Sequence, residues 1–312
     1  MKNVEFIYGD TSIPEFEDMF GGWLTAYNGR TFMVDAGVGT GGPSMAARMK
    51  DRLGGRPLDY VLLTHIHLDH AGGLGEILKA WPEVKILAHA KGVPHLISPA
   101  RLWAGTREVM GERVGAMYGE PTPIDPARLI AHTDSDIAGL KIIETPGHAP
   151  HHLSFRLGET MFVGEAGGCP DPYNGRTYMT TASPPKFYPE AALGSVDRLL
   201  QEPDGPAYFG HTHDPLPLHA TLRIRQRQLA RWEELLRRPE SARRPDETHR
   251  QHIDRLIELM FEEDQDCVPK AWLSPAALWR HQYFAGNDLE GFLGYLADEA
   301  RRKKSERPAT TG

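Results

Sequence analysis

The sequence predicts a mixed α/β or α+β protein on three observations. Short apolar or alternating runs, typical of β-strands, recur through the first two thirds of the chain. Helical patterns separate some of these runs, which favours helices packed on sheets. After residue 220 the strand-like runs stop, and Leu, Arg, Glu and Ala recur at helical spacing. A chain of 312 residues, 40% hydrophobic and 25% charged, is long enough for one large domain and an added region.

Nine runs in the first part of the chain are predicted as strands. They span residues 4–8, 23–27, 31–34, 60–63, 84–88, 141–144, 153–157, 161–163 and 207–209. The dipeptide Asn28-Gly29 joins the second run to the third and favours the tight turn of a hairpin.

Helical patterns among the strands cover residues 43–53, 74–80 and 189–201. Later helices are predicted over 220–237, 246–264, 274–284 and 288–304, with breaks at Pro239, Pro245, Pro269 and Asn287. We therefore expect one domain over residues 1–220 and a helical C-terminal extension over 221–312. The extension is expected to serve as a cap over the functional site or as the surface of a homodimer.

The charge is unevenly distributed along the chain. Of the net charge of −7, residues 1–220 carry −8 and the remaining residues carry +1. Because nucleic-acid binding relies on clustered positive charge, the acidic part favours a small-molecule substrate over a nucleic acid. We find neither a signal peptide's apolar segment nor the roughly 18 apolar residues of a membrane helix. A cytoplasmic protein without a membrane partner is expected.

Ligand-type side chains gather directly after the predicted strand at 60–63. The segment YVLLTHIHLDHAGG places His65, His67, Asp69 and His70 within six residues. In an extended segment residues i and i+2 point to the same side, so His65 and His67 can bind one ion. The turning chain lets Asp69 and His70 face a second ion. Imidazole and carboxylate together suit borderline divalent cations, so the segment predicts a metal site.

Three other strand ends carry the same kinds of side chain. His148 lies on a Pro-Gly turn, Glu165 follows Gly164, and His211 follows Gly210. Glycine lets the backbone bend at the mouth of a sheet, where sites are commonly assembled from several loops. These three residues can supply the further ligands that two metal sites would need.

With these motifs the sequence resembles the metallo-β-lactamase-fold hydrolase superfamily. Residues 65–70 match its H-x-H-x-D-H motif, and the later histidine, carboxylate and histidine follow in the same order. The resemblance covers residues 1–220, which it identifies as the catalytic domain. It implies a four-layered αβ/βα sandwich with two metal ions at one edge of two packed sheets.

The resemblance also implies a role for each ligand-type residue. One ion would be held by His65, His67 and His148, the other by Asp69, His70 and His211, with Glu165 at the bridging position. Asp35 matches a position that supports the metal loop, and a turn-forming aspartate is the alternative reading. The family usually has aspartate where this chain has Glu165, so the carboxylate can bridge or bind one ion only. Zinc is the expected metal, and iron or manganese fit the same ligands.

Two such cations, about 3.5–4 Å apart, would generate hydroxide from water and polarise the substrate. The expected reaction is hydrolysis of a small ester, thioester, lactone or phosphoester. In it Asp69 would orient or deprotonate the water, and His213 would protonate the leaving group. Two alternatives stay open. One is a mono-iron sulfur (persulfide) dioxygenase, and the other is a non-catalytic, metal-containing binding or regulatory protein.

The stretch 169–188 is too long and irregular for a simple connection, and such loops often carry function. We expect it to overhang the metals. Its candidate substrate contacts are Tyr173, Arg176, Tyr178 and Lys186. A packed surface loop is the alternative.

Overall fold

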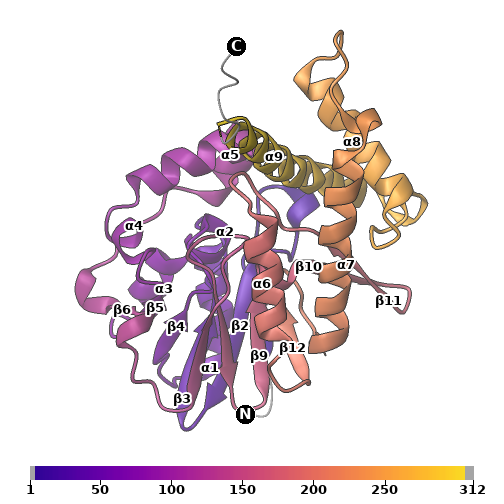
Figure 1. Ribbon diagram of the computed structural model, residues 1–312. Coiled ribbons are helices and arrows are strands. Elements are labelled where there is room, and N and C mark those ends of the chain that lie inside the picture. The colour runs from indigo at the N-terminus through magenta and orange to yellow at the C-terminus, as the bar shows by residue number, and fades with distance from the viewer. Residues whose placement is uncertain (1–3, 306–312) are drawn as a thin grey trace.

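Two mixed β-sheets face each other in the computed structural model, which describes residues 4–305 (Figure 1). The first sheet has six strands in the order β1 to β6. They are β1 (Glu5–Tyr8), β2 (Gly21–Tyr27), β3 (Arg30–Val34), β4 (Tyr60–Leu62), β5 (Lys85–Ala88) and β6 (Leu129–Ala131). Strands β1 to β3 pair antiparallel, and β3 to β6 pair parallel. The predicted turn at Asn28-Gly29 joins β2 to β3.

The second sheet has five strands in the order β13-β12-β9-β8-β7. They are β7 (Leu140–Glu144), β8 (Leu153–Leu157), β9 (Thr160–Gly164), β12 (Pro206–Phe209) and β13 (Leu216–Pro217). Each of the nine predicted runs forms a strand of one of the two sheets. Strands β6 and β13 were not predicted.

Large aromatic side chains fill the space between the sheets. Trp23 and Phe32 of the first sheet meet Phe155, Phe162 and Tyr208 of the second. Burying a side chain of this kind contributes about 1.5–3 kcal/mol, so this layer holds the sheets face to face. The strand ends that carry the ligand-type residues therefore meet at one edge of the sandwich.

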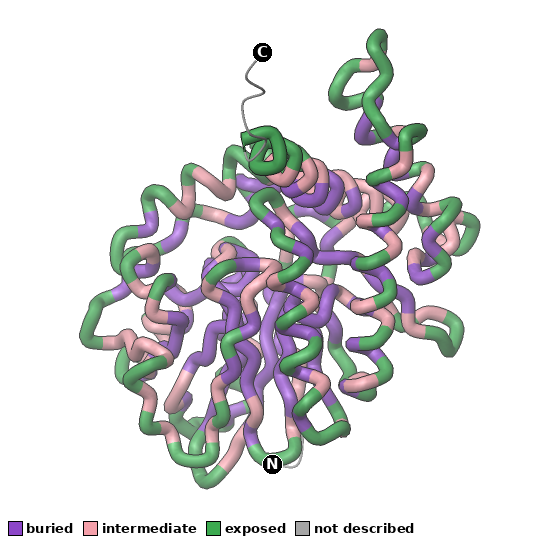
Figure 2. Tube along the Cα trace, in the orientation of Figure 1, coloured by how far each residue is buried: buried purple, intermediate pink, exposed green. Residues whose placement is uncertain are grey.

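Helices cover the outer faces of both sheets. The first sheet packs against α1 (Gly42–Leu53), α3 (Leu74–Ala80) and α4 (Val93–Ile97), and the second against α6 (Pro189–Leu199) and α7 (Leu218–Arg237). The expected four-layered αβ/βα sandwich is confirmed, with buried sheets between more exposed helices (Figure 2).

The helical extension continues from α7 into α8 (His249–Glu263) and α9 (Pro275–Ser305). The predicted break at Asn287 is wrong, because α9 runs through it without interruption. The next residue, Asp288, accepts hydrogen bonds from Ser183 N and Thr181 Oγ1, and Phe292 is fully buried. These contacts outweigh the low helix propensity of asparagine.

A long helix that the sequence did not predict lies beside α9. This helix, α5 (Ala100–Tyr118), is kinked at Gly111, and Trp279, Tyr283 and Phe284 of α9 pack in its hydrophobic cluster. Figure 1 shows both helices across the edge of the sandwich where α2 (Leu68–Ala71) lies.

The stretch 169–188 is not the irregular loop that was expected. Its first half is a hairpin of β10 (Cys169–Tyr173) and β11 (Arg176–Thr180), turning at Asn174-Gly175. Within residues 4–305, no helix combines the length and the apolarity needed to cross a membrane.

Candidate metal centre

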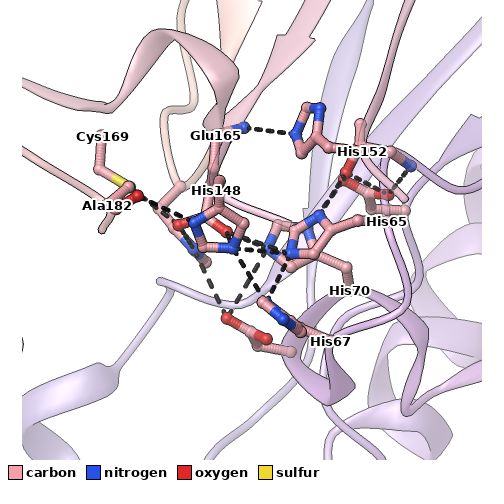
Figure 3. Close-up of polar contacts among 12 residues, drawn as sticks. His65, His67, His70, His148, His152, Glu165, Cys169 and Ala182 are labelled. Carbon is pink, nitrogen blue, oxygen red and sulfur yellow. Dashed lines mark hydrogen bonds and ion pairs between the residues drawn. The ribbon is translucent and has the colours of Figure 1, made fainter. Parts of the chain in front are cut away.

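Three imidazoles converge at one edge of the sandwich. His65 and His67 follow β4, and His148 follows β7. The Nε2 atom of His65 lies 3.0 Å from Nδ1 of His67 and 3.1 Å from Nε2 of His148. The third distance, from His148 Nε2 to His67 Nδ1, is 2.9 Å. Figure 3 shows these rings pointing toward one another. The three nitrogens therefore surround one point, as ligands of one ion do.

A second group of ligand-type side chains lies next to the first. Oδ2 of Asp69 is 3.7 Å from Nε2 of His70 and 3.7 Å from Nε2 of His211. The remaining member is Glu165, whose Oε1 is 3.5 Å from His211 Nε2. In each group the ligand atoms, those of Glu165 included, lie within 4.8 Å of one another.

Glu165 stands between the two groups. Its Oε2 lies 3.0 Å from His148 Nε2 and 3.1 Å from His70 Nε2, so one carboxylate faces both. The extra methylene of glutamate fits because Gly210 has no side chain. A Cβ atom on Gly210 would lie 2.5 Å from Cγ of Glu165. The departure from aspartate is thus compatible with a bridging position.

Asp35 orients the imidazole of His70. Its Oδ2 accepts a hydrogen bond from His70 Nδ1 at 2.9 Å, and both side chains are buried. The carboxylate also accepts from the amide and hydroxyl of Thr64. The Thr64 hydroxyl in turn lies 3.1 Å from Nδ1 of His65, from which it can accept. With their protons on Nδ1, His65 and His70 present Nε2 lone pairs to the centre.

Two further imidazoles have the same arrangement. Nδ1 of His148 donates to the carbonyl of Ala182 at 3.0 Å, and Nδ1 of His211 lies 3.4 Å from the carbonyl of Met19. Both therefore present Nε2 to the centre, whereas His67 presents Nδ1.

His152 belongs behind the centre rather than in it. The side chain is fully buried, and its Nε2 accepts a hydrogen bond from the amide of Glu165 at 3.1 Å. Its Nδ1 therefore carries the proton and donates to Thr145 Oγ1 at 2.9 Å. The chain continues through Ser154 Oγ to the carbonyl of Val163. This network fixes the backbone that presents Glu165.

Burial and neighbouring charges together set the pKa values at the centre. Burial lowers the pKa of His65 and of His67 well below the ordinary 6.5, and neighbouring imidazoles lower both further. At His70 burial is outweighed by nearby carboxylates, which hold its pKa well above the ordinary 6.5, and a cation would have to displace that proton. Burial alone would raise the pKa of Glu165, but His148 and the imidazole hydrogen bonds hold it well below its ordinary value. Neutral imidazoles and charged carboxylates are the forms that bind divalent cations.

Asp69 gives a further sign that the donor set fits a cation. Its Oδ1 is buried and has no hydrogen-bond partner among residues 4–305. A buried carboxylate oxygen without a partner is costly unless an ion or another ligand meets it. Oδ2 faces the imidazoles as a cation ligand would, and Oδ1 is left for a further ligand such as a water, so the residues present fit a hydrated divalent cation.

The centre lies in the wall of a cavity of about 1440 Å³, between the sheet edge and the helices α5 and α9. Of the residues expected to meet substrate, Lys186 lines this cavity, and so does His213, whose Nε2 donates to the carbonyl of Asp18. Three others lie away from it on the β10–β11 hairpin. The Tyr173 and Tyr178 rings pack on Trp272, and Arg176 pairs with Asp266.

Several cavity residues could not be found from the sequence. Two of them, Tyr118 and Arg280, lie on α5 and α9. Neither residue belongs to a sequence motif, and helix α5 was not predicted. Only their position in the folded protein shows that they line the cavity.

A third group of ligand-type residues, His89, His132 and Glu144, lies outside the centre. The amides of Lys91 and Ala90 donate to Nδ1 of His89 and of His132, respectively. Each neutral ring therefore carries its proton on Nε2, and His132 donates that proton to Glu144 at 2.9 Å. No Nε2 lone pair is left for a cation, so this group is a hydrogen-bonded cluster rather than a metal site.

Comparison with known proteins agrees with this architecture. Residues 23–213 match the model of the Metallo-beta-lactamase superfamily. A metallo-beta-lactamase fold-containing protein, ST1585 of Sulfurisphaera tokodaii, is 28% identical over 213 residues, covering 66% of this chain and 76% of that protein. Its crystal structure matches with a TM-score of 0.62 over 94% of this chain and 98% of that one, at 21% identity.

Two other proteins are also similar to this chain. The hydroxyacylglutathione hydrolase of Xylella fastidiosa is 30% identical over 179 residues, which is 55% of this chain and 56% of that enzyme's length. TTHA1623, solved in a di-iron-bound form, matches with a TM-score of 0.50 over 69% of this chain and 97% of that one, at 24% identity. By the match to the family model, which spans most of its length, this chain belongs to the metallo-beta-lactamase superfamily.

Proposed function

We propose that this protein is a metal-dependent hydrolase that holds two divalent cations and cleaves a thioester of a small molecule. The observation that carries the proposal is the pair of ligand groups that share Glu165. The kinship with hydroxyacylglutathione hydrolase supports a thioester, since an acyl group on the glutathione sulfur is a thioester.

The proposal assigns the ligand-type residues to two cations according to the distances between them. One cation would be held by His65, His67 and His148, the other by Asp69, His70 and His211, and Glu165 would contact both. Zinc suits nitrogen and oxygen ligands, and iron is the alternative that the di-iron form of TTHA1623 supports. The two cations would supply a nucleophilic hydroxide at neutral pH and polarise the substrate carbonyl.

Asp69 is suited to handle the proton of the attacking water. Its Oδ2 faces the imidazoles of His70 and His211, whereas Oδ1 is buried without a partner, and the residue lines the cavity. Oδ1 can therefore accept a hydrogen bond or a proton from the water. A thiolate leaves with little need of a proton, so His213 matters less here than it would for an ester or phosphoester.

Two cationic side chains in the cavity wall suit an anionic group of the substrate. Lys186 and Arg280 both line the cavity, and neither forms an ion pair with an acidic side chain among residues 4–305. They are positioned to meet a carboxylate of the thiol half or the acyl half. The volume of about 1440 Å³ exceeds the roughly 300–1000 Å³ of common ligand sites, so a molecule the size of a peptide thiol fits. In this role α5 and α9 act as the cap.

The test combines metal analysis with a substrate panel. Protein from metal-replete expression is assayed for bound zinc, iron and manganese, and for thiol release from S-lactoylglutathione and from neutral acetyl thioesters. Lactones, phosphodiesters and persulfides complete the panel. We expect two ions per chain and the fastest turnover with the carboxylate-bearing thioester. A single bound iron together with persulfide-dependent oxygen consumption would contradict the proposal and identify the protein as a dioxygenase.

A further inference from the structure

The phenol of Tyr118 is a buried hydroxyl without a partner. The residue ends α5, is 1% exposed, and lines the cavity together with Asp69. No hydrogen bond to its Oη is formed within residues 4–305. By contrast, the hydroxyl of Tyr283 donates to the carbonyl of Met110 at 2.9 Å. A buried hydroxyl without a hydrogen-bond partner is costly, so the unpaired Tyr118 hydroxyl indicates that a ligand supplies the partner.

The ring of Tyr118 packs on Phe20, which also packs on His211 of the second ligand group. The ring of Phe20 contacts Tyr118 edge-on at 5.6 Å and His211 at 5.5 Å, between ring centroids. The backbone is fixed by the amide of Gly39, which donates to the Tyr118 carbonyl at 2.8 Å. Burial raises the pKa of the phenol, and the nearby charge of Asp69 raises it further, so the hydroxyl keeps its proton and acts as a donor.

Two side chains that line one cavity thus carry a buried unpaired donor and a buried unpaired acceptor. The Tyr118 hydroxyl and Asp69 Oδ1 do not bond each other, and each lacks any other protein partner among the described residues. A reacting carbonyl and an attacking water need such a pair, because the carbonyl oxygen gains negative charge while the water loses a proton.

We propose that Tyr118 is a catalytic residue whose hydroxyl donates a hydrogen bond to the substrate oxygen on which negative charge develops. The inference rests on the proposed hydrolase function and adds a residue that no motif of the sequence marks. Preorganised donors of this kind, when removed, lower kcat by roughly 100–1000-fold in a site without metal. Because cations would share the charge here, we expect a loss of roughly 10–100-fold.

The experiment compares Tyr118→Phe with the matched control Tyr283→Phe, both in the metal-loaded full chain. The readouts are kcat and KM for a thioester, metal content, melting temperature, and the affinity for inorganic phosphate as an oxyanion probe. For Tyr118→Phe we expect unchanged metal content, an equal or higher melting temperature, lower kcat with little change in KM, and weaker phosphate binding. For Tyr283→Phe we expect a lower melting temperature, because a hydrogen bond is lost, and unchanged kcat.

The outcomes separate the two proposals. A merely structural role would lower the melting temperature of Tyr118→Phe and leave kcat and phosphate affinity unchanged, which would overturn the inference. If the wild type cleaves no thioester, the proposed function fails, while phosphate affinity still tests Tyr118. An unchanged affinity, or a wild type that binds no phosphate, would overturn the assignment whatever the substrate proves to be.

Discussion

His70 Nδ1 donates a hydrogen bond to Asp35 Oδ2 over 2.9 Å, within the buried edge of the sandwich. Asp35 reaches this place with a φ of 63°, in the left-handed region that aspartate tolerates better than most residues. The same carboxylate accepts from the amide and hydroxyl of Thr64. One side chain thus orients His70 directly and His65 through Thr64, so it supports both ligand groups.

Asp35→Ala is expected to weaken metal binding by roughly 10–100-fold, because partners that orient metal ligands contribute about that much. The measurement is a competition titration against a chromophoric chelator. The control is Asp10→Ala, since Asp10 is exposed and pairs with Arg48 away from the centre. Equal affinities in wild type and Asp35→Ala would show that Asp35 only shapes its turn.

His152→Leu is expected to lower the free energy of unfolding by about 1–3 kcal/mol, because the buried amide of Glu165 loses its acceptor. Urea unfolding of the metal-free protein measures this change. His249→Leu, at an exposed position, should change stability by no more than about 0.5 kcal/mol. Similar stability losses in the two variants would contradict the role given to His152.

Glu165→Asp tests the fit of the longer carboxylate. Both oxygens of Glu165 are within 3.5 Å of imidazole nitrogens, one on each side of the centre. Shortening the side chain draws the carboxylate away from at least one group. We therefore expect one ion to stay bound and the affinity for the second to fall at least about tenfold. Glu83→Asp, which shortens an exposed carboxylate paired with Arg128, is the control. Wild-type affinity for both ions would mean that the length at this position is immaterial.

The stability of the protein should depend on pH through Asp288. Burial raises the pKa of this carboxyl from 3.8 to about 6 in the folded protein. Stability from the protonated form is then fully present below pH 4 and is lost as the pH rises through about 6. Relative to Asp288→Asn, the wild type should lose about 3 kcal/mol between pH 3.5 and 7. Unfolding of both proteins across this range tests the sign, and a constant difference would contradict it.

The ligand-type residues of the two groups were accessible to sequence reasoning because they follow predicted strands and four of them lie within six residues. The structure brings these side chains together in two groups that share Glu165. The orientation of each ring could not be predicted, since it depends on partners distant in sequence. Asp35 is 35 residues from His70, and Ala182 is 34 residues from His148.

Two elements could not be predicted from the sequence, for definite physical reasons. The hairpin at 169–180 turns at Asn174-Gly175, the same type of dipeptide that predicted the turn at Asn28-Gly29. Its first strand was not predicted because it contains Pro170 and Pro172, and proline is rare inside strands. Proline is tolerated there because the two strands form a sheet of their own, where each lies at an edge. Helix α5 was missed because its amphipathic pattern is weak and Gly111 interrupts it.

The central claim is that one buried set of ligands holds two metal ions. Elemental analysis of the purified chain, expressed with ample zinc and iron, tests it most directly. We expect two ions per chain in the wild type, and at most one in His67→Ala, because the first group then loses one of its three imidazoles. A wild type without bound metal, or a His67→Ala variant that still holds two ions, would contradict this claim.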